Sequence, residues 1–383
     1  MIGKVPFRSM IVAAAALFLS ADVLEGGTSY RVVNLGSLDG KATAATALND
    51  RGEVVGWSEV DVGFGLNYDR AFLWTPEVGM RDLGITPGYS GGNMRAQGIS
   101  EDGAVTGWSG NNDVFVWDSV TGIRTVASGL GYDINSSGII AGFSSVVFDD
   151  TAFTWDSENG VQVLPLPMGY NDSRAYAVNE QGRVVGGVGI DSHDSRAIAW
   201  DPVVGMIDIG LLPGGSNSLA KAINEYGEVA GTADSQTRAF FWSPLNGFTE
   251  IVATDPAIRV SHAYGMNDLG DVVGAATRYE QVEGGTVGHN FAFFWNPEAG
   301  FVDLNDWVEP VNGCTLQRAY DINNKGQIVG FGEFDNGKRG FLLNVIPEPS
   351  SIIGLISLLV SSELLWWRRG VGSRHEPSRS NYQ

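Results

Sequence analysis

The stretch Ala222-Ile223-Asn224-Glu225-Tyr226-Gly227-Glu228-Val229-Ala230-Gly231 decides how this chain folds, because its pattern recurs along the sequence. The pattern is Asn-x-x-Gly-x-Val/Ile-x-Gly, and a copy in which Ser100 replaces the asparagine belongs to the same series. The other copies begin at Asn49, Asn135, Asn179, Asn224, Asn267 and Asn323. A unit that recurs at intervals of tens of residues indicates a repeat architecture.

A second pattern alternates with the first, and it consists of an apolar stretch that ends in Trp, followed five residues later by Gly. It appears at Trp74, Trp117, Trp155, Trp200, Trp242 and Trp295. A short apolar-rich segment follows each copy, for example 206–210. Glycine permits the positive φ of a tight turn, and Asn or Pro favours a turn. Each repeat therefore reads as four short strands joined by hairpins.

Four strands repeated seven times predict an all-β, seven-bladed β-propeller. The two ends of the repeat region complement each other. The last repeat stops after its third strand, 339–343, and the segment 32–36 near the N-terminus resembles an isolated fourth strand. Pairing the two would complete the seventh blade and leave no open sheet edge. A β-solenoid is the alternative, but it would not need complementary partial repeats.

Composition supports a β-rich, exported body over residues 29–345. The chain has 52 glycines among 383 residues, and 10% of its residues are aromatic, which suits many short strands and tight turns. Its formal net charge of −20 excludes a sequence-independent nucleic-acid binder, which needs a basic face.

Hydrophobic segments frame this body. Residues 1–28 have the features of a signal peptide, with Lys4 and Arg8 before an apolar run at 10–19. The run 352–367 predicts a C-terminal transmembrane helix, although 16 residues is short for one. Arg368 and Arg369 follow it and predict a cytoplasmic tail at 370–383, with the body outside.

The first strand of each predicted blade should line the central axis. The position three residues before the motif asparagine is occupied by Thr46, Gln97, Tyr132, Tyr176, Lys221, Tyr264 and Tyr320. The four tyrosines suit packing between blades, or alternatively a ring of stacking platforms for a sugar. Asp133 and Asp321 also lie on this strand. They either accept hydrogen bonds from local backbone donors or form a carboxylate pair for glycosidic acid/base chemistry.

Connections of variable length should all emerge on one face of the ring, which makes that face the place to expect binding. They include 58–68, 85–94, 188–194, 275–289 and 332–338. Arg95, Arg174, His262 and Arg318 share one repeat position at the channel mouth on this face. They are either solvated strand-end charges or a cationic ring that selects an anionic glycan. The sequence contains no catalytic motif or metal-ligand spacing, and predicts no cofactor.

The repeats resemble a known family. Arg70-Ala71-Phe72-Leu73-Trp74, Met80-Arg81-Asp82-Leu83-Gly84 and Ala222-Ile223-Asn224 are similar to the probable extracellular HAF repeats, although Arg70 stands where that family has histidine. The resemblance covers about residues 30–345. It implies a β-rich extracellular protein and no established activity.

The C-terminus, residues 346–369, resembles a PEP-CTERM sorting signal, a short domain also labelled the ice-binding protein C-terminal domain. The resemblance rests on Pro347-Glu348-Pro349, the apolar run and Arg368-Arg369. It implies that an exosortase, a membrane protease of bacteria that make exopolysaccharide, recognises Pro347, Glu348 and Pro349. The helix would then hold the protein in the inner membrane only until processing.

These features predict an exported, non-enzymatic protein of the cell surface or extracellular matrix. Its variable-loop face would bind polysaccharide or another envelope component. Two other functions stay open. One is a glycan-active lyase or hydrolase on the propeller scaffold, and the other is a structural coat protein.

Overall fold

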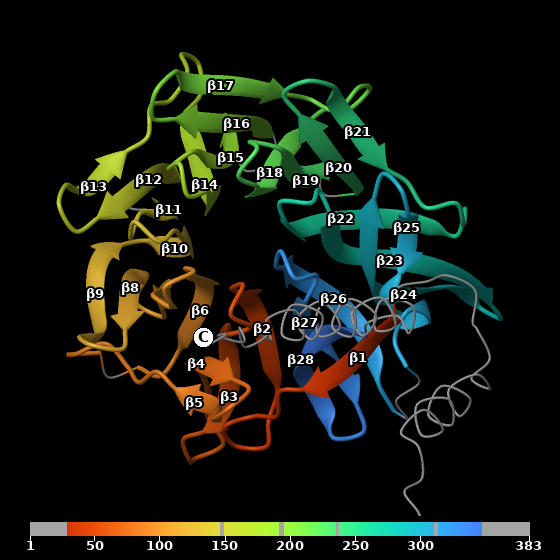
Figure 1. Ribbon diagram of the computed structural model, residues 1–383, viewed down its shortest axis with the longest axis horizontal. Helices are drawn as coiled ribbons and strands as arrows, with labels where there is room; N and C mark the ends of the chain where they lie inside the picture. Colours follow the sequence, from red (N-terminus) through yellow and green to blue (C-terminus); the bar gives the residue numbers. More distant parts are fainter. Residues whose placement is uncertain are drawn as a thin grey trace, which may run out of the picture. The chain divides into compact units, whose positions relative to one another are not determined.

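Seven four-stranded antiparallel sheets stand around a central axis in the computed structural model of the protein (Figure 1). The structure describes residues 29–89, 91–145, 149–190, 195–234, 237–309 and 313–346. In six of the sheets the four strands follow one another along the chain, from the axis outward. The prediction of a seven-bladed β-propeller is confirmed.

The first four blades are regular. Blade 1 contains β2 (Thr43–Leu48), β3 (Val54–Asp61), β4 (Asn67–Thr75) and β5 (Gly79–Asp82), and blade 2 contains β6 (Met94–Ile99), β7 (Val105–Ser109), β8 (Asp113–Asp118) and β9 (Gly122–Ser128). Blade 3 contains β10 (Leu130–Ile134), β11 (Ile140–Ser144), β12 (Thr151–Asp156) and β13 (Gly160–Val163), and blade 4 contains β14 (Asp172–Val178), β15 (Val184–Gly189), β16 (Ser195–Asp201) and β17 (Gly205–Gly210).

The remaining blades complete the ring. Blade 5 contains β18 (Ser218–Ile223), β19 (Val229–Ala233), β20 (Arg238–Ser243) and β21 (Gly247–Ile251). Blade 6 contains β22 (Ile258–Met266), β23 (Val272–Val282), β24 (Gly285–Asn296) and β25 (Gly300–Asp303), followed by the short 3-10 helix η1 (Leu304–Asp306). Blade 7 contains β26 (Thr315–Ile322), β27 (Ile328–Phe334), β28 (Gly337–Ile346) and β1 (Ser29–Asn34).

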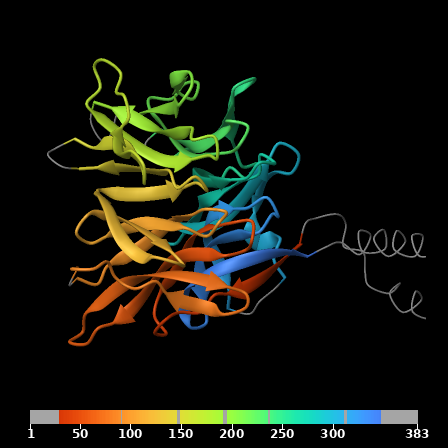
Figure 2. The same ribbon diagram turned by 60° about the vertical axis from the view of Figure 1, so that its left-hand side comes forward.

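The N-terminal strand closes the ring, as predicted. The seventh sheet has the order β1-β28-β27-β26, and β1 lies beside β28 in both views (Figures 1 and 2). The Leu35 N–H donates to the Gly340 carbonyl at 3.0 Å. The Gly340 N–H in turn donates to the Thr43 hydroxyl of blade 1 at 2.8 Å. The last blade is therefore joined both to the start of the chain and to the first blade.

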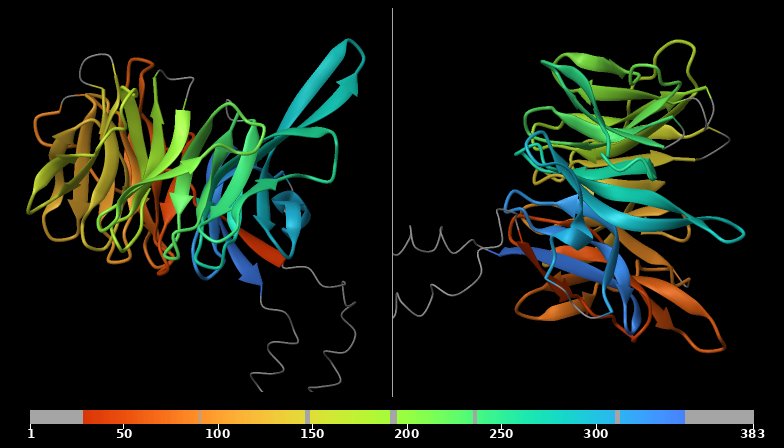
Figure 3. Two further views of the ribbon diagram at one scale, coloured as in Figure 1. Left: turned by 90° about the horizontal axis from the view of Figure 1, so that it is seen from above. Right: turned by 90° about the vertical axis from the view of Figure 1, so that its right-hand side faces the viewer.

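Three of the predicted loops lie largely within strands: 58–68 in β3 and β4, 332–338 in β27 and β28, and, longest of all, 275–289 in β23 and β24. Residues 275–289 form most of a long two-stranded hairpin made by β23 and β24, which projects from the ring (Figure 3). The register pairs Val272 with Trp295 at its base and Val282 with Gly285 at its tip. Unbroken pairing of the two strands satisfies the backbone, so the insertion extends the sheet instead of forming an irregular loop.

The predicted signal peptide 1–28, the sorting residues, the helix 352–367 and the tail 370–383 lie outside the described residues. Within the part of the chain that the structure describes, no helix has the length and apolar character needed to span a membrane.

A large apolar side chain on the third strand anchors each blade. It lies two residues before the tryptophan of the second sequence pattern, or before Leu343 in blade 7. It is Phe in six blades and Ile198 in blade 4, and all seven are at most 2% exposed: Phe72, Phe115, Phe153, Ile198, Phe240, Phe293 and Phe341. Burying a phenylalanine contributes about 1.5–3 kcal/mol, so these residues are a main source of cohesion.

The motif asparagine connects each blade to the next. Within its own turn, the Asn267 Oδ1 accepts from the N–H groups of Leu269 and Asp271, both at 3.0 Å. Its Nδ2 donates to the Asn323 carbonyl of blade 7 at 3.1 Å. The same amide-to-carbonyl bond, at 2.9–3.3 Å, crosses six of the seven blade junctions. We call this circular set of bonds the amide ladder.

A second set of bonds runs parallel to the amide ladder. The residue after the motif asparagine accepts, through its side chain, the corresponding backbone N–H of the preceding blade. Examples are Glu225 N–H to Asp268 at 2.9 Å and Asn324 N–H to Asp50 at 2.8 Å. Both sets are interrupted between blades 2 and 3. There Ser100 replaces the asparagine and bonds within its own turn, to Asp102 and Ala104.

We predict that Ser100→Asn stabilises the protein. The new amide can reach the Asn135 carbonyl and complete the ladder, which should add about 1 kcal/mol to the free energy of unfolding. Asn267→Ala should instead remove about 2–3 kcal/mol, because it breaks the buried bond to the Asn323 carbonyl and leaves two partly buried turn N–H groups without their acceptor. Urea unfolding measures both changes, and Ser157→Asn at an exposed turn is the control. A Ser100→Asn variant no more stable than wild type would contradict the role of the ladder.

Candidate functional site

Every innermost strand carries a β-bulge at the residue three places before the motif asparagine. Pairing with the second strand skips that residue in all seven blades, for example between Ala45 and Ala47 and between Ala319 and Asp321. The last glycine of the motif makes the bulge possible. A Cβ on Gly186 would lie 1.8 Å from the Arg174 carbonyl oxygen, and a Cβ on any of the other six glycines would lie 1.9–2.3 Å from the matching oxygen. Bulges redirect side chains, and here they redirect them into the channel.

The bulged residues form a collar around the axis. They are Thr46, Gln97, Tyr132, Tyr176, Lys221, Tyr264 and Tyr320, and all seven line one cavity of about 250 Å³. We call them the collar. Neighbouring rings touch, with Tyr132 and Tyr176 centroids 5.0 Å apart and Tyr264 and Tyr320 centroids 5.3 Å apart. The tyrosines therefore pack against each other across blades, as predicted, and their side chains line the cavity; stacking of a sugar on them stays a prediction.

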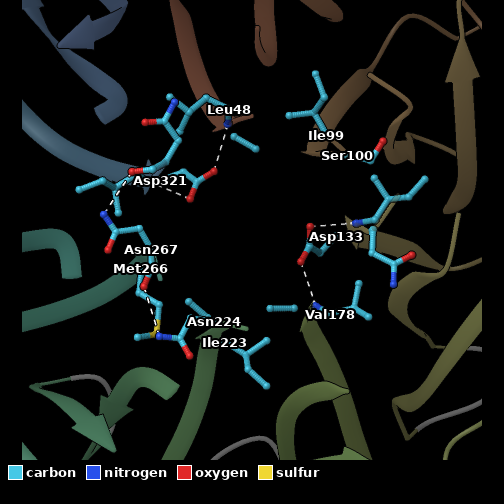
Figure 4. A pocket seen from close by; sticks show the side chains of 18 of the residues that line it. Leu48, Ile99, Ser100, Asp133, Val178, Ile223, Asn224, Met266, Asn267 and Asp321 are labelled. Carbon is cyan, nitrogen blue, oxygen red and sulfur yellow. Dashed lines mark hydrogen bonds between the residues drawn. The ribbon is translucent and has the colours of Figure 1, made fainter. Parts of the chain in front are cut away.

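The cavity lies at the end of the channel that carries the Asn-x-x-Gly turns, which we call the turn face. Asp133 and Asp321 lie on opposite sides of it (Figure 4). Each carboxylate accepts two backbone N–H groups, one from its own strand and one from the next blade. Asp133 accepts from Ile134 at 2.8 Å and Val178 at 2.9 Å. Asp321 accepts from Ile322 at 2.9 Å and Leu48 at 3.0 Å.

Each aspartate faces a glycine in the preceding blade. A Cβ on Gly98 would lie 2.8 Å from the Asp133 Cα, and one on Gly265 would lie 2.7 Å from the Asp321 Cα. The other three blades have alanine at this position, in Ala47, Ala177 and Ala222. The Gly–Asp pair thus occurs twice around the ring, because each aspartate needs the space that the glycine leaves.

Three groups in the cavity titrate near neutral pH. Burial raises the pKa of Asp133 to about 6, although the hydrogen bonds from the backbone of Val178 and Ile134 lower it. Burial, together with repulsion from Asp133 and Glu101, raises the pKa of Asp321 to about 7. Burial and the nearby positive charge of Arg174 lower the pKa of Lys221 to about 7.

The four basic residues predicted at the other mouth lie outside this cavity, on what we call the loop face. Each rests on an aromatic ring. Arg95 lies over Trp57 at 4.7 Å and Trp108 at 5.5 Å from the ring centroids, and pairs with Asp69 at 2.6 Å. Arg174 lies over Phe143 and forms ion pairs with Asp150 and Asp172.

The other two basic residues are less strongly paired. Arg318 lies over Phe331 at 5.8 Å, and His262 stacks on Tyr264 at 5.9 Å between centroids. Burial and repulsion from Arg318 and Lys221 lower the pKa of His262, so this residue is neutral at pH 7. The mouth is therefore aromatic, with two of its guanidinium groups already neutralised, and it is less cationic than the sequence suggested.

The structure brings Asp133 and Asp321 into one cavity and leaves Arg95, Arg174, His262 and Arg318 at the opposite mouth. Lys221 and the acidic rim of the cavity were not among the predicted site residues. The rim comprises Asp50, Glu101, Glu180, Glu225 and Asp268. The signal for both was present in the sequence, because Lys221 shares the repeat position of the tyrosines, and each rim residue follows the motif asparagine or, for Glu101, the Ser100 that replaces it.

Comparisons with known proteins identify the fold more clearly than the activity. Residues 245–363 match a family described as a protein of unknown function, DUF3466. No curated protein matches the sequence.

Among solved structures, virginiamycin B lyase from Staphylococcus aureus has a TM-score of 0.53 at 12% identity, covering 82% of this chain and 99% of that one. This likeness supports the propeller fold alone. A streptogramin B lyase (TM-score 0.36, 13% identity, 66% and 93% coverage) and a gluconolactonase from Xanthomonas campestris (0.38, 10%, 84% and 98%) are too dissimilar to support an argument.

We predict that the aspartates make stability depend on pH. The pKa of Asp321 is about 7 in the folded protein and ~3.9 in an unfolded chain, so folding favours its protonated form. This contribution is complete below about pH 4 and is lost as the pH rises through 7. The free energy of unfolding of wild type, minus that of Asp321→Asn, should therefore fall between pH 4.5 and 8. Urea unfolding measures it, and a difference that is constant with pH would contradict the prediction.

Proposed function

We propose that this chain is an exported, non-enzymatic bacterial protein of the cell surface or extracellular matrix that binds polysaccharide through its loop face. The signal-like segment 1–28 and the residues Pro347-Glu348-Pro349 support export and sorting by an exosortase. The C-terminal apolar run would place the chain in the inner membrane before processing. The propeller supplies a rigid scaffold on which variable loops can form a binding surface.

The observation that carries the binding proposal is the arrangement of planar groups at the loop-face mouth. Trp57, Trp108 and Phe331, which are partly exposed, and Phe143, which is buried against Tyr132, occupy one repeat position, directly after the last glycine of the motif. Guanidinium groups lie over these rings, and the Arg95 side chain remains 36% exposed. Aromatic surface beside fixed hydrogen-bond donors suits a ligand that has apolar faces and hydroxyl groups at its edges, as a sugar has.

The second candidate is a glycan-active lyase or hydrolase, and one observation favours it. Asp133, Asp321 and Lys221 titrate between about pH 6 and 7 within one cavity, as acid and base catalysts often do. Against it, both oxygens of each aspartate already bond to backbone N–H groups, and the two carboxylates lie on opposite walls. A structural and binding role accounts for these contacts without a reaction.

We predict that the full-length protein binds on an array of bacterial polysaccharides without releasing products. Arg95→Ala should weaken binding about tenfold, because it removes donors and the cover of two tryptophan rings. The matched control is Arg81→Ala, since Arg81 lies over Trp117 at 5.4 Å on an outer strand. Equal losses in the two variants, or no binding by wild type, would contradict loop-face binding. Release of shortened oligosaccharides would instead support the enzyme.

Sorting makes a separate prediction. In a bacterium that has an exosortase, the intact mass of the mature protein should correspond to a C-terminus near Pro349. Glu348→Ala should retain the hydrophobic segment, because the residue lies within the recognition motif that the resemblance implies. Glu333→Ala, on β27, is the control and should be processed normally. Identical masses for wild type and Glu348→Ala would count against exosortase processing.

A further inference from the structure

The cavity on the turn face has two similar walls. One carries Asp133 beside Tyr132 and Tyr176, and the other carries Asp321 beside Tyr320 and Tyr264. The fold itself does not require either carboxylate, because the other five blades close with alanine or glycine at the same position. Each aspartate also depends on a glycine across the junction that gives it space. The paired substitutions therefore point to a role beyond ring closure.

The first wall already holds the amino group of Lys221. The Lys221 Nζ lies 3.4 Å from the centroid of the Tyr176 ring, which is close contact between a cation and an aromatic face. Such contacts are strongest where water is excluded. This wall shows that the collar has room for a primary amine against a tyrosine ring inside the channel. Because burial lowers the pKa of Lys221 to about 7 and no carboxylate in the described part of the chain pairs with it there, a carboxylate beside the ring is what a fully charged ammonium would need.

The second wall offers the same chemistry without a lysine. Among the described residues, no cation lies over Tyr264 or Tyr320, and Thr46 follows them in the collar where Lys221 follows Tyr176. Asp321 stands beside these rings, and each of its oxygens keeps a second lone pair after accepting a backbone N–H. The surroundings are acidic, since Asp133 and the rim residues face the same cavity. Arg318 and His262 lie outside the cavity, toward the loop face.

We propose that this cavity binds an organic ammonium ion, with the Asp321 carboxylate as its acceptor and the Tyr264 and Tyr320 rings as its walls. The ammonium can belong to a free polyamine or to a deacetylated amino sugar, which share the same charged group. This site is separate from the loop-face site and stands on different residues. Binding at one face can therefore be present when binding at the other is absent.

The test measures binding of cadaverine, a five-carbon diamine, to the full-length protein by calorimetry. Asp321→Asn should weaken binding at least about tenfold, because a charge-assisted hydrogen bond is lost. Asp133→Asn is the matched control. It removes the same number of backbone contacts from the wall that Lys221 occupies, and should change affinity by no more than about threefold. Absence of binding by wild type, or equal losses in both variants, would overturn the proposal.

The aromatic contribution is tested separately from folding. Tyr320→Phe keeps the ring and should bind cadaverine within about threefold of wild type, whereas Tyr320→Leu should lose about tenfold. Equal affinities of the Phe and Leu variants would argue against a ring wall. Thermal unfolding of each variant shows whether the protein remains folded. If Tyr320→Leu does not fold, the comparison of Asp321→Asn with Asp133→Asn decides the matter.

Two further binding measurements distinguish a polyamine from an amino sugar as the source of the ammonium. Glucosamine trimer is compared with N-acetylglucosamine trimer, in which acetylation removes the charge. Tighter binding of the glucosamine trimer than of cadaverine, abolished by acetylation, assigns the site to an amino sugar, and the reverse order assigns it to a polyamine. Equal binding of the acetylated and free trimers, undisturbed by Asp321→Asn, would overturn ammonium recognition. Loss of array binding in Arg95→Ala with cadaverine binding intact would show that the two sites are independent.

The pH profile gives an independent readout. Cadaverine stays charged, with amine pKa values near that of lysine at ~10.4. Asp321 loses its proton with a pKa of about 7, so affinity should rise about thirtyfold from pH 5.5 to 8 if only the carboxylate binds. Asp133, Lys221, Glu101 and Glu180 also face the cavity and can contribute to this slope. Asp321→Asn should remove most of this dependence of cadaverine affinity on pH. An unchanged dependence in that variant would contradict Asp321 as the acceptor.

Discussion

The side-chain amide of the motif asparagine holds this protein together. In Asn267, for example, the amide oxygen accepts backbone N–H groups of its own turn, and the amide nitrogen donates to a carbonyl of the next blade. Local folding and ring assembly therefore depend on the same atoms. The blades also meet through apolar packing, which is not directional. The amide ladder adds direction, because a blade that is shifted or rotated cannot offer its carbonyl to the preceding amide.

The bulge on each innermost strand is the second constraint, and it converts a structural repeat into a possible binding site. A regular strand would place the collar residue and its neighbour on opposite faces. The bulge lets both line the channel, so Tyr320 and Asp321, for example, are adjacent in sequence and share one cavity wall. Glycine opposite the bulge is needed because a Cβ would collide with a carbonyl oxygen. The last glycine of the motif therefore also determines which side chains of the chain line the channel.

The sequence predicted the number of blades and the closing strand because those depend on local turns and on counting. It did not predict the bulge, since the alternation of a regular strand hides it. It also missed the second role of the asparagine, because the partner of Asn323, for example, is Asn49 at the other end of the repeats. Asp133 and Asp321 were identified as unusual residues, but the glycines that accommodate them lie in other blades. The cationic ring was overestimated because the partners of Arg95 and Arg174, such as Asp69 and Asp150, lie in the loops and in preceding strands.

The position of the two chain ends in blade 7 gives the body an orientation. β28 is the third strand of its blade and runs toward the turn face, and β1 begins there (Figure 3). Both ends of the repeat region therefore lie at the turn face, and the long β23–β24 hairpin projects at the opposite, loop face. A ligand at the loop face and a ligand in the cavity would therefore approach the ring from opposite directions and would not compete for space.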